Sequence, residues 1–287
     1  MCNRNQLVSA FVLTYNHQDY IEKSLMGIIN QECCFNVELI IANDSSQDQT
    51  DLIIRKIIRE YSSSFVRIKY ICKNENIGIS EIIKEALQEC KGDYIAICEG
   101  DDFWTDPHKL EKQVNFLNRN LEFIICGSRI TIKRLNGQEQ ENKIKIGAVS
   151  LLDSLYKNQF STCSVVIRKQ QQLENFFLKK FDDFYVKDWP LWTSLLKYGK
   201  GYNLKEITAT YNEHKGGVFS GKTLDEKLNF FLKDRMLMLA NFPEKKFVIK
   251  LYGYKTLLLY LKNSILKKEY FLSLNSNRKL IYSFLKA

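Results

Sequence analysis

Three carboxylates follow directly on an apolar run, as Glu99, Asp101 and Asp102 come after the sequence Tyr-Ile-Ala-Ile-Cys at 94–98. The run has no polar face, which is typical of a central strand covered on both sides. Carboxylates clustered at the end of a strand raise one another's pKa unless a cation lies between them. A divalent ion with oxygen ligands would neutralise them, and Mg²⁺ or Mn²⁺ usually brings phosphate with it. The alternative is an acidic turn in which the two aspartates cap the following helix.

The first half of the chain alternates the patterns of strands and helices. We predict strands over 7–14, 37–42, 67–72 and 94–98, and helices over 21–29, 50–61, 80–90 and 107–117. This order indicates a parallel α/β sheet, in which ligands bind beyond the carboxyl ends of the strands. The first two strands also end in polar residues, Thr14-Tyr15-Asn16 and Asn43-Asp44-Ser45-Ser46. We expect both segments to meet the carboxylates in one crevice.

The alternation stops after residue 129. A polar stretch over 134–145 is expected to form a loop or hairpin. Strands are predicted over 161–168 and 202–211, with a helix over 187–198 between them, and residues 225–287 are predicted to be mainly helical. These patterns predict three parts, over 1–130, 131–222 and 223–287.

The composition is that of an ordinary globular protein, with 45% apolar and 26% charged residues. The eight cysteines form no Cys-x-x-Cys pair, which favours a reducing cytosol over a disulfide framework and argues against a zinc site. The N-terminal segment lacks the pattern of a signal peptide, and no uncharged apolar run approaches the ~20 residues of a membrane-spanning helix. We therefore expect a soluble, cytoplasmic protein.

The net charge of +9 lies at one end of the chain. Residues 245–287 contain ten basic residues and one acid, Glu269, whereas the rest of the chain holds 32 of each sign. A neutral body does not suit a nucleic-acid-binding domain, so no nucleic acid is expected as a partner. The basic, aromatic-rich segment 245–287 fits peripheral contact with an anionic surface such as the inner face of the cytoplasmic membrane. The alternative is a solvated, helix-packed tail, because its lysines do not share one helical face.

Five short motifs, in order, resemble those of the family 2 glycosyltransferases. They are Thr14-Tyr15-Asn16, the polar run over 43–50, Asn76-Ile77-Gly78, Lys91-Gly92-Asp93-Tyr94-Ile95 and Glu99-Gly100-Asp101-Asp102. The resemblance covers about residues 1–220 and is closest to bacterial members whose metal motif reads Glu-Gly-Asp-Asp-aromatic-Trp. It implies the GT-A fold, an α/β fold with a Rossmann-like, mainly parallel sheet flanked by helices. The nucleotide-sugar-binding half would cover 1–130, the acceptor-binding half 131–222, and a basic, mainly helical extension 223–287.

The resemblance implies a metal-dependent enzyme that moves a sugar, with inversion, from a nucleotide-diphosphate sugar to a hydroxyl of a glycan or lipid-linked acceptor. UDP is the favoured nucleotide, surface polysaccharide biosynthesis the expected setting, and Mn²⁺ or Mg²⁺ the expected ion. The ion would be held by Asp101, Glu99 and His214, with Asp101 the best candidate for a direct ligand and Glu99 acting directly or through water. The donor-binding residues would be Thr14, Tyr15, Asn16, Asp44, Asn76, Gly78 and Gly100.

The acceptor side is expected to centre on Asp188, which precedes the helix predicted over 187–198. The resemblance makes it the general base that deprotonates the acceptor hydroxyl. Its alternative role is a helix N-cap ahead of Pro190. Asp102, Trp104 and Trp189 are expected to contact the acceptor, although a tryptophan is more often a core residue.

The three histidines of the chain fall into two groups. His214 lies in a segment, 211–217, that resembles a Tyr-x-x-His-x-Gly-Gly segment of related sequences, and the resemblance implies that this segment closes over the diphosphate. It is a candidate metal ligand or phosphate contact, with an exposed loop histidine as the alternative. His17 and His108 show no pattern of partners, and we expect both at the surface.

Residues 216–223 match the Walker A pattern of phosphate-binding loops. A P-loop ATPase is nevertheless disfavoured, because no later acidic residue ends an apolar strand and the 64 residues after Thr223 are too few for a nucleotide-binding sheet. A nucleotidyltransferase is disfavoured because the loop after the first strand carries no lysine or arginine. The remaining rival is a non-catalytic module that binds nucleotide sugars or glycans on the same fold.

Overall fold

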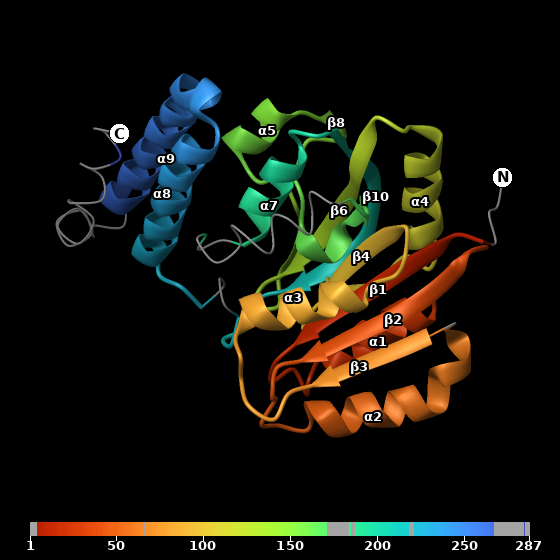
Figure 1. The fold of residues 1–287 in the computed structure, drawn as a ribbon. Coiled ribbons are helices and arrows are strands. Elements are labelled where there is room, and N and C mark those ends of the chain that lie inside the picture. The colour runs from red at the N-terminus through yellow and green to blue at the C-terminus, as the bar shows by residue number, and fades with distance from the viewer. Residues whose placement is uncertain are drawn as a thin grey trace.

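The computed structural model describes residues 5–65, 67–170, 184, 187–217, 221–266 and 284. A twisted sheet runs through the body with helices packed on it, and the C-terminal helices stand to one side (Figure 1). Ten strands of the described residues form the sheet, in the order β3-β2-β1-β4-β9-β6-β10-β5, with β7 beside β6 and β8 beside β10. The predicted fold class, a mostly parallel α/β sheet flanked by helices, is confirmed.

The first half is a parallel unit. Its strands are β1 (Leu7–Thr14), β2 (Asn36–Asn43), β3 (Arg67–Cys72) and β4 (Tyr94–Glu99). Its helices are α1 (Ile21–Ile29), α2 (Thr50–Tyr61), α3 (Ile79–Glu89) and α4 (Lys109–Arg119). Strand β1 pairs in parallel with β2 and β4, and β2 pairs in parallel with β3. The predicted elements are all present, with small shifts at their ends.

The side chains of β1 alternate between two cores. Val8, Ala10 and Val12 belong to a core built with α1, α2 and α4, whereas Phe11 belongs to the opposite core with α3. None of the four is more than 2% exposed. A strand buried on both faces has no solvent side to show in its sequence. This explains why the central strands β1 and β4 read as apolar runs without a clear period of two.

The second half extends the sheet with β5 (Phe103–Trp104), β6 (Phe123–Lys133), β7 (Glu139–Glu141), β8 (Gly147–Val149), β9 (Val166–Arg168) and β10 (Lys200–Asn212). Strand β9 lies between β4 and β6 and is antiparallel to both, whereas β6 and β10 are parallel. Two short helices, α5 (Leu151–Tyr156) and α7 (Asp188–Leu195), belong to this half. The polar stretch predicted as a loop or hairpin includes the β6–β7 turn.

The strand predicted over 161–168 is shorter than expected. Thr162–Ser164 form a 3-10 turn, and only Val166–Arg168 pair in the sheet. The amide and the hydroxyl of Ser164 both donate to the carbonyl oxygen of Ser161, each at 2.8 Å. A serine that bonds back to its own chain in this way competes with strand pairing. The strand therefore begins only beyond it.

The described part of the C-terminal extension is a pair of helices, α8 (Leu224–Asn241) and α9 (Lys246–Leu266), which lie side by side (Figure 1). Arg235 of α8 is 2% exposed and donates to the carbonyl oxygens of Leu155 and Tyr156, at 3.1 and 3.0 Å. These carbonyls end α5, and a cation there stabilises the helix terminus. The extension is therefore tied to the second half. None of the helices in the described part of the chain combines the length and the apolar character needed to span a bilayer.

A buried acid ties the amino ends of the parallel strands together. Glu38 of β2 is 1% exposed and accepts hydrogen bonds from Ser9 Oγ at 2.6 Å, Arg67 Nη1 at 2.9 Å and the Gly92 amide at 3.2 Å. Burial raises its pKa, but the hydrogen bonds and the charge of Arg67 outweigh burial and hold the pKa below its ordinary value. The ionised form is therefore the one that the fold stabilises.

Replacing Glu38 by Ala should lower the free energy of unfolding by about 2–3 kcal/mol at neutral pH, because four donors, Ser9 Oγ, Arg67 Nη1 and the amides of Lys91 and Gly92, lose their acceptor. Since the folded-state pKa is lowered, this contribution is complete above the unfolded pKa of ~4.3 and is lost as the pH falls through the folded pKa. Urea unfolding at neutral and acidic pH measures both effects, and the gap between wild type and variant should shrink in acid. Glu60→Ala, at an exposed position, is the control. Equal stability of Glu38→Ala and wild type at neutral pH would contradict the prediction.

Candidate functional site

The carboxyl ends of β1, β2 and β4 lie next to one another. Thr14 pairs with Asn43 of β2, and Leu13 pairs with Glu99 of β4. Gly100 continues this contact, since its amide donates to the carbonyl oxygen of Leu13 at 2.7 Å. A Cβ on Gly100 would lie 2.6 Å from Thr14 Oγ1, so only glycine fits between these two strand ends. The three polar strand ends therefore share one edge of the sheet.

The loops after β1 and β2 are locked to each other. The Asn16 amide donates to Ser46 Oγ at 2.9 Å, and Asn16 Oδ1 accepts from the Gln47 amide at 2.7 Å. Asn16 and Ser45 have φ angles of 56° and 62°, a left-handed conformation that asparagine tolerates better than most residues. Tyr15 stays 44% exposed beside this fixed loop. An exposed aromatic ring of this kind can stack on a flat nucleobase.

Asp44 holds a third loop against the other two. Its carboxylate oxygens accept from the amides of Ile77 and Gly78, at 2.8 and 2.9 Å, and its carbonyl oxygen accepts from Asn76 Nδ2 at 3.2 Å. Gly78 has a φ of 86° and directly precedes α3, a conformation that favours glycine. Three of the residues predicted to bind the donor, Asp44, Asn76 and Gly78, thus form one assembly in which Asp44 positions the others.

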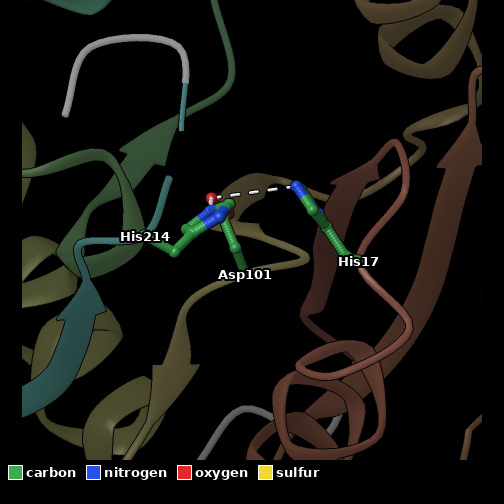
Figure 2. A group of neighbouring side chains, drawn as sticks. All are labelled: His17, Asp101 and His214. Atoms are coloured by element: carbon green, nitrogen blue, oxygen red, sulfur yellow. Dashed lines mark hydrogen bonds and ion pairs between the residues drawn. The ribbon is translucent and has the colours of Figure 1, made fainter. Parts of the chain in front are cut away.

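Two histidines converge on Asp101 (Figure 2). His214 Nε2 lies 2.9 Å from Asp101 Oδ2, and His17 Nε2 lies 3.8 Å from the same oxygen. His17 follows β1, Asp101 follows β4 and His214 follows β10. One ligand atom from each side chain lies within 4.8 Å of the other two. Imidazole nitrogens and a carboxylate oxygen at this separation could hold a metal ion.

Neighbouring groups orient the members of this cluster. Thr14 Oγ1 lies 3.2 Å from His17 Nδ1, so that Nε2 is left to face Asp101. Asn212 Nδ2 donates to the carbonyl oxygen of Asp101 at 2.6 Å. The rings of Tyr20 and His214 pack with their centroids 4.9 Å apart. Contacts behind the ligand atoms hold the rings in orientation, as supporting residues of metal sites do.

The charges within the cluster are coupled. The hydrogen bond to Asp101 raises the pKa of His214, whereas burial lowers the pKa of His17. Burial alone would raise the pKa of Asp101, but the hydrogen bond from His214 and the charge of His17 hold that pKa below its ordinary value. Asp101 is therefore an anion at neutral pH, which is the state that a metal ligand needs.

Glu99 does not join this cluster, in contrast to the expected set of ligands. Its Oε2 atom is buried and has no hydrogen-bond partner among the described residues. Burial, and then the charges of Asp101 and Asp188, raise the pKa of Glu99 to about 8. Of the three expected ligands, the structure brings Asp101 and His214 together and leaves Glu99 apart.

His17 is the third member of the cluster, in which the sequence analysis did not include it. The expectation that His17 lies at the surface is wrong. Its side chain is only 16% exposed. A signal was present, because His17 stands three residues after Thr14 in the polar segment beyond the first strand, where ligands bind in such sheets. The expectation for His108 is confirmed, since its side chain is 51% exposed and lies 3.8 Å from Glu32.

Asp188 is the second carboxylate near Glu99. Its Oδ2 atom accepts from Asn158 Nδ2 at 2.9 Å and from Thr162 Oγ1 at 3.4 Å, and its Oδ1 atom accepts from the Trp189 amide at 2.6 Å. The N-cap position of α7 is Lys187, and Asp188 is the first residue of the helix. Asp188 therefore does not occupy the N-cap position that its alternative role required. Burial raises the pKa of Asp188, although these hydrogen bonds oppose the rise. A fixed carboxylate with a raised pKa has the properties of a general base.

The three residues expected to contact the acceptor are buried. Asp102, Trp104 and Trp189 are 2%, 4% and 2% exposed. Asp102 Oδ1 accepts from a backbone amide of β10 at 2.9 Å, and the indole N–H groups donate to the carbonyl oxygens of Cys163 and Ser154, at 2.8 and 2.7 Å. Because their polar atoms are bonded inside the protein, they act as core residues in this structure, and we do not propose them as acceptor contacts.

The Walker A match ends in a helix cap. Thr223 Oγ1 accepts from the Glu226 amide at 3.2 Å, and Glu226 Oε2 accepts from the Thr223 amide at 2.8 Å, which forms a capping box at the start of α8. Lys222 Nζ lies 3.5 Å from Glu226 Oε1. Residues 218–220 of the match lie outside the described residues. The lysine and threonine of the motif contact Glu226 at the helix start, which favours a structural role over a phosphate-binding loop.

Comparison with protein-family models gives one match, to the family described as Glycosyl transferase family 2, over residues 9–180. An uncharacterized protein of Mycobacterium tuberculosis is 32% identical over 77% of this chain and 62% of its own length, so the chain spans less than two thirds of this relative. The putative teichuronic acid biosynthesis glycosyltransferase TuaG of Bacillus subtilis is 29% identical over 81% of this chain and 89% of its own. The UDP-Glc:alpha-D-GlcNAc-diphosphoundecaprenol beta-1,3-glucosyltransferase WfaP of Escherichia coli is 28% identical over 76% and 81%.

Solved structures share the same architecture. TarS 1–349 of S. aureus, in complex with UDP-GlcNAc, has a TM-score of 0.63 at 18% identity, over 89% of this chain and 72% of its own. The mannosyltransferase PcManGT from Pyrobaculum calidifontis, in complex with GDP-Man and Mn²⁺, has a TM-score of 0.65 at 15% identity, over 96% and 76%. At these identities the likeness shows the fold, and the fold is the GT-A fold.

Proposed function

The chain belongs to glycosyl transferase family 2, and on this premise we propose that it moves a sugar from a nucleoside-diphosphate sugar to a hydroxyl, with inversion at the anomeric carbon. The donor is a UDP-sugar, and the acceptor is a glycan or lipid-linked intermediate of cell-surface polysaccharide biosynthesis at the cytoplasmic face of the membrane. The names of TuaG and WfaP, which state teichuronic acid biosynthesis and a diphosphoundecaprenol-linked acceptor, support this class. The observation that carries the proposal is the cluster of His17, Asp101 and His214 at the carboxyl edge of the sheet.

The cluster fits the metal ion that the fold implies. Its donors are two imidazoles and one carboxylate whose ligand atoms lie within 4.8 Å of one another. Imidazole suits transition-metal ions, whereas Mg²⁺ prefers oxygen ligands and keeps several waters, so Mn²⁺ is the better of the two expected ions. When bound, such an ion supplies Lewis-acid stabilisation of the negative charge on the departing diphosphate.

We place the nucleotide over the locked loops at the ends of β1 and β2. Tyr15 offers an exposed ring on which the base can stack. Asp44, which holds the 76–78 segment through two backbone amides, forms the wall of this site and keeps carboxylate lone pairs for a donor on the base. Asn16 fixes the two loops against each other, so little ordering is left to occur when the donor binds.

Asp188 is the proposed general base. Its Oδ2 atom takes the proton of the acceptor hydroxyl as the hydroxyl oxygen bonds to the anomeric carbon and the bond from that carbon to the diphosphate oxygen breaks. Attack from the face opposite the leaving group inverts the anomeric centre. Asn158 and Thr162 donate to the same carboxylate and hold it in place. Glu99, with its pKa of about 8, is mainly neutral and adds little repulsion to the anionic form of the base.

A thermal-shift screen of nucleotide sugars tests the donor and the metal together. A ligand at 100 times its Kd stabilises the folded state by about 2.7 kcal/mol, which raises the Tm of a protein of this size by several degrees. We expect a UDP-sugar to do so in the presence of Mn²⁺ and to lose the effect in EDTA. If a nucleotide sugar raised the Tm equally in EDTA and in Mn²⁺, the proposed metal requirement would be wrong. If no nucleotide sugar raised the Tm, the proposed donor site would be wrong.

A further inference from the structure

Helix α9 carries a continuous apolar stripe on its solvent side. Phe247, Leu251, Tyr254 and Leu258 are 78%, 52%, 41% and 66% exposed. They recur at steps of four, three and four residues, which places them on one face of the helix. The other face is buried, as Ile249 at 0% exposed shows. Single exposed apolar residues are common, whereas a contiguous patch of them marks an interaction surface.

The same helix is basic and contains no acid. Residues 246–266 include Lys246, Lys250, Lys255 and Lys262 but neither Asp nor Glu. Lys246 and Lys255 are exposed. The segment from 245 to the end of the chain accounts for the entire net charge of +9. An apolar stripe on a basic helix is complementary to a layer that has an apolar interior and anionic groups at its surface.

We propose that α9 docks on a lipid bilayer rich in anionic head groups, with its axis in the plane of the interface. Phe247, Leu251 and Leu258 would enter the boundary between head groups and acyl chains, as the apolar face of an interfacial helix does. Lys246 is exposed and long enough to keep its ammonium group among the head groups while its stem stays in apolar surroundings. Lys255 is also exposed, but its Nζ atom lies 4.7 Å from the centre of the Tyr156 ring, so its charge lies beside α5.

A second copy of the chain is the competing occupant, since steps of four and three also form the seam of a coiled coil. Such a seam is stabilised by opposite charges beside it. Here the flanking side chains Lys250 and Lys255 would meet lysines of the copy, and α9 offers no acid to pair with them. Charge therefore favours the anionic lipid surface over self-association.

The docked helix belongs to the same half as the proposed base. Its Tyr252 ring packs on Tyr156 of α5, with the centroids 4.8 Å apart. The hydroxyls of Ser154 in α5 and Thr193 in α7 are hydrogen-bonded at 2.7 Å, and α7 begins at Asp188. This consequence rests on the proposed function: a bilayer held by α9 would lie on the acceptor side of the enzyme, where a lipid-linked acceptor is needed.

Vesicle co-sedimentation of the full chain tests the docking. We expect the wild type to bind vesicles of phosphatidylcholine with about a third phosphatidylglycerol, to bind pure phosphatidylcholine weakly, and to be released by salt. The triple variant Phe247→Ser, Leu251→Ser, Leu258→Ser should bind anionic vesicles at least ~10-fold less, because each buried apolar side chain contributes to the partition. The matched control replaces three exposed leucines of the body, Leu52, Leu121 and Leu135, which are 68%, 75% and 58% exposed, by Ser and should bind as the wild type does.

Two results would overturn the docking. The first is equal vesicle binding by the triple variant and the wild type. The second is a wild type that does not bind anionic vesicles and forms a dimer in solution, together with a triple variant that is a monomer. Thermal melting of the triple variant shows whether it is folded. Its stabilisation by a nucleotide sugar should equal that of the wild type, since α9 lies outside the donor site. Loss of vesicle binding with donor stabilisation intact therefore separates this inference from the proposed function.

Discussion

Replacing Asp188 by Asn is expected to lower kcat by about 10²–10⁴-fold, the usual contribution of a general base, while donor binding stays almost unchanged. The amide cannot take the acceptor proton, whereas the loops that bind the nucleotide lie at the ends of other strands. Because the base must be ionised and burial raises its pKa, the wild-type rate should fall in acid with a midpoint above the ~3.9 of a free aspartate. Steady-state transfer assays across pH, together with donor titration by thermal shift, measure both effects.

The matched control for this change is Asp93→Asn. It makes the same chemical replacement at an exposed position just before β4, where the carboxylate accepts from the Leu7 amide at 3.2 Å. It should transfer sugar at nearly the wild-type rate. An Asp188→Asn variant with full activity would remove the base from the mechanism. A wild type that binds donor but shows no turnover with any acceptor would instead favour the non-catalytic binding module.

Replacing Asp101 by Asn is expected to abolish Mn²⁺ binding at the cluster and to lower the transfer rate by about 10²–10³-fold, the effect of removing one strong stabiliser of developing charge. Asp101 is the only anion of the cluster, so its loss leaves two imidazoles without the negative charge that attracts a cation. His17→Ala should weaken Mn²⁺ binding less, because it removes one neutral ligand and keeps the carboxylate. Calorimetric titration with Mn²⁺ and activity as a function of Mn²⁺ concentration provide the measurements.

Asp106→Asn is the control for the loss of a carboxylate from the same segment, since Asp106 pairs with Lys112 at 2.5 Å outside the cluster. It should keep Mn²⁺ affinity and activity. Unchanged Mn²⁺ affinity in Asp101→Asn would show that the ion is held elsewhere. If the His17→Ala variant had the same Mn²⁺ affinity and activity as the wild type, His17 would have only a structural role beside Thr14.

The parallel half of the fold was predictable because its signals are local. The run from Tyr94 to Cys98 is apolar throughout since it is covered on both faces. The 3-10 turn at Thr162–Ser164 was not predictable from pattern. The predicted strand loses residues 161–165, where the hydroxyl of Ser164 bonds to the carbonyl oxygen of Ser161, although the apolar sequence that follows is unchanged.

The cluster of His17, Asp101 and His214 shows where sequence reasoning stops. That Asp101 belongs to a site followed from its position at the end of an apolar strand. Which side chains join it depends on how loops after β1, β4 and β10 fold over one edge of the sheet, and Asp101 and His214 are 113 residues apart in the chain. Glu99 is only two residues away in sequence, but it is the last residue of β4 whereas Asp101 lies in the turn beyond it, so the alternation of the strand does not set where the two side chains lie.

The sequence by itself determined the α/β class, the polar strand ends and the acidic motif at 99–102, since period, composition and turn residues are properties of neighbouring residues. The tertiary structure alone decided that His17 and His214 lie beside Asp101, that Trp104 and Trp189 are buried, and that α9 shows an apolar stripe to solvent. Each of these depends on burial and on distances between segments far apart in the chain. Burial also raises the pKa of Glu99 and Asp188, because the surrounding protein removes water from their carboxylates.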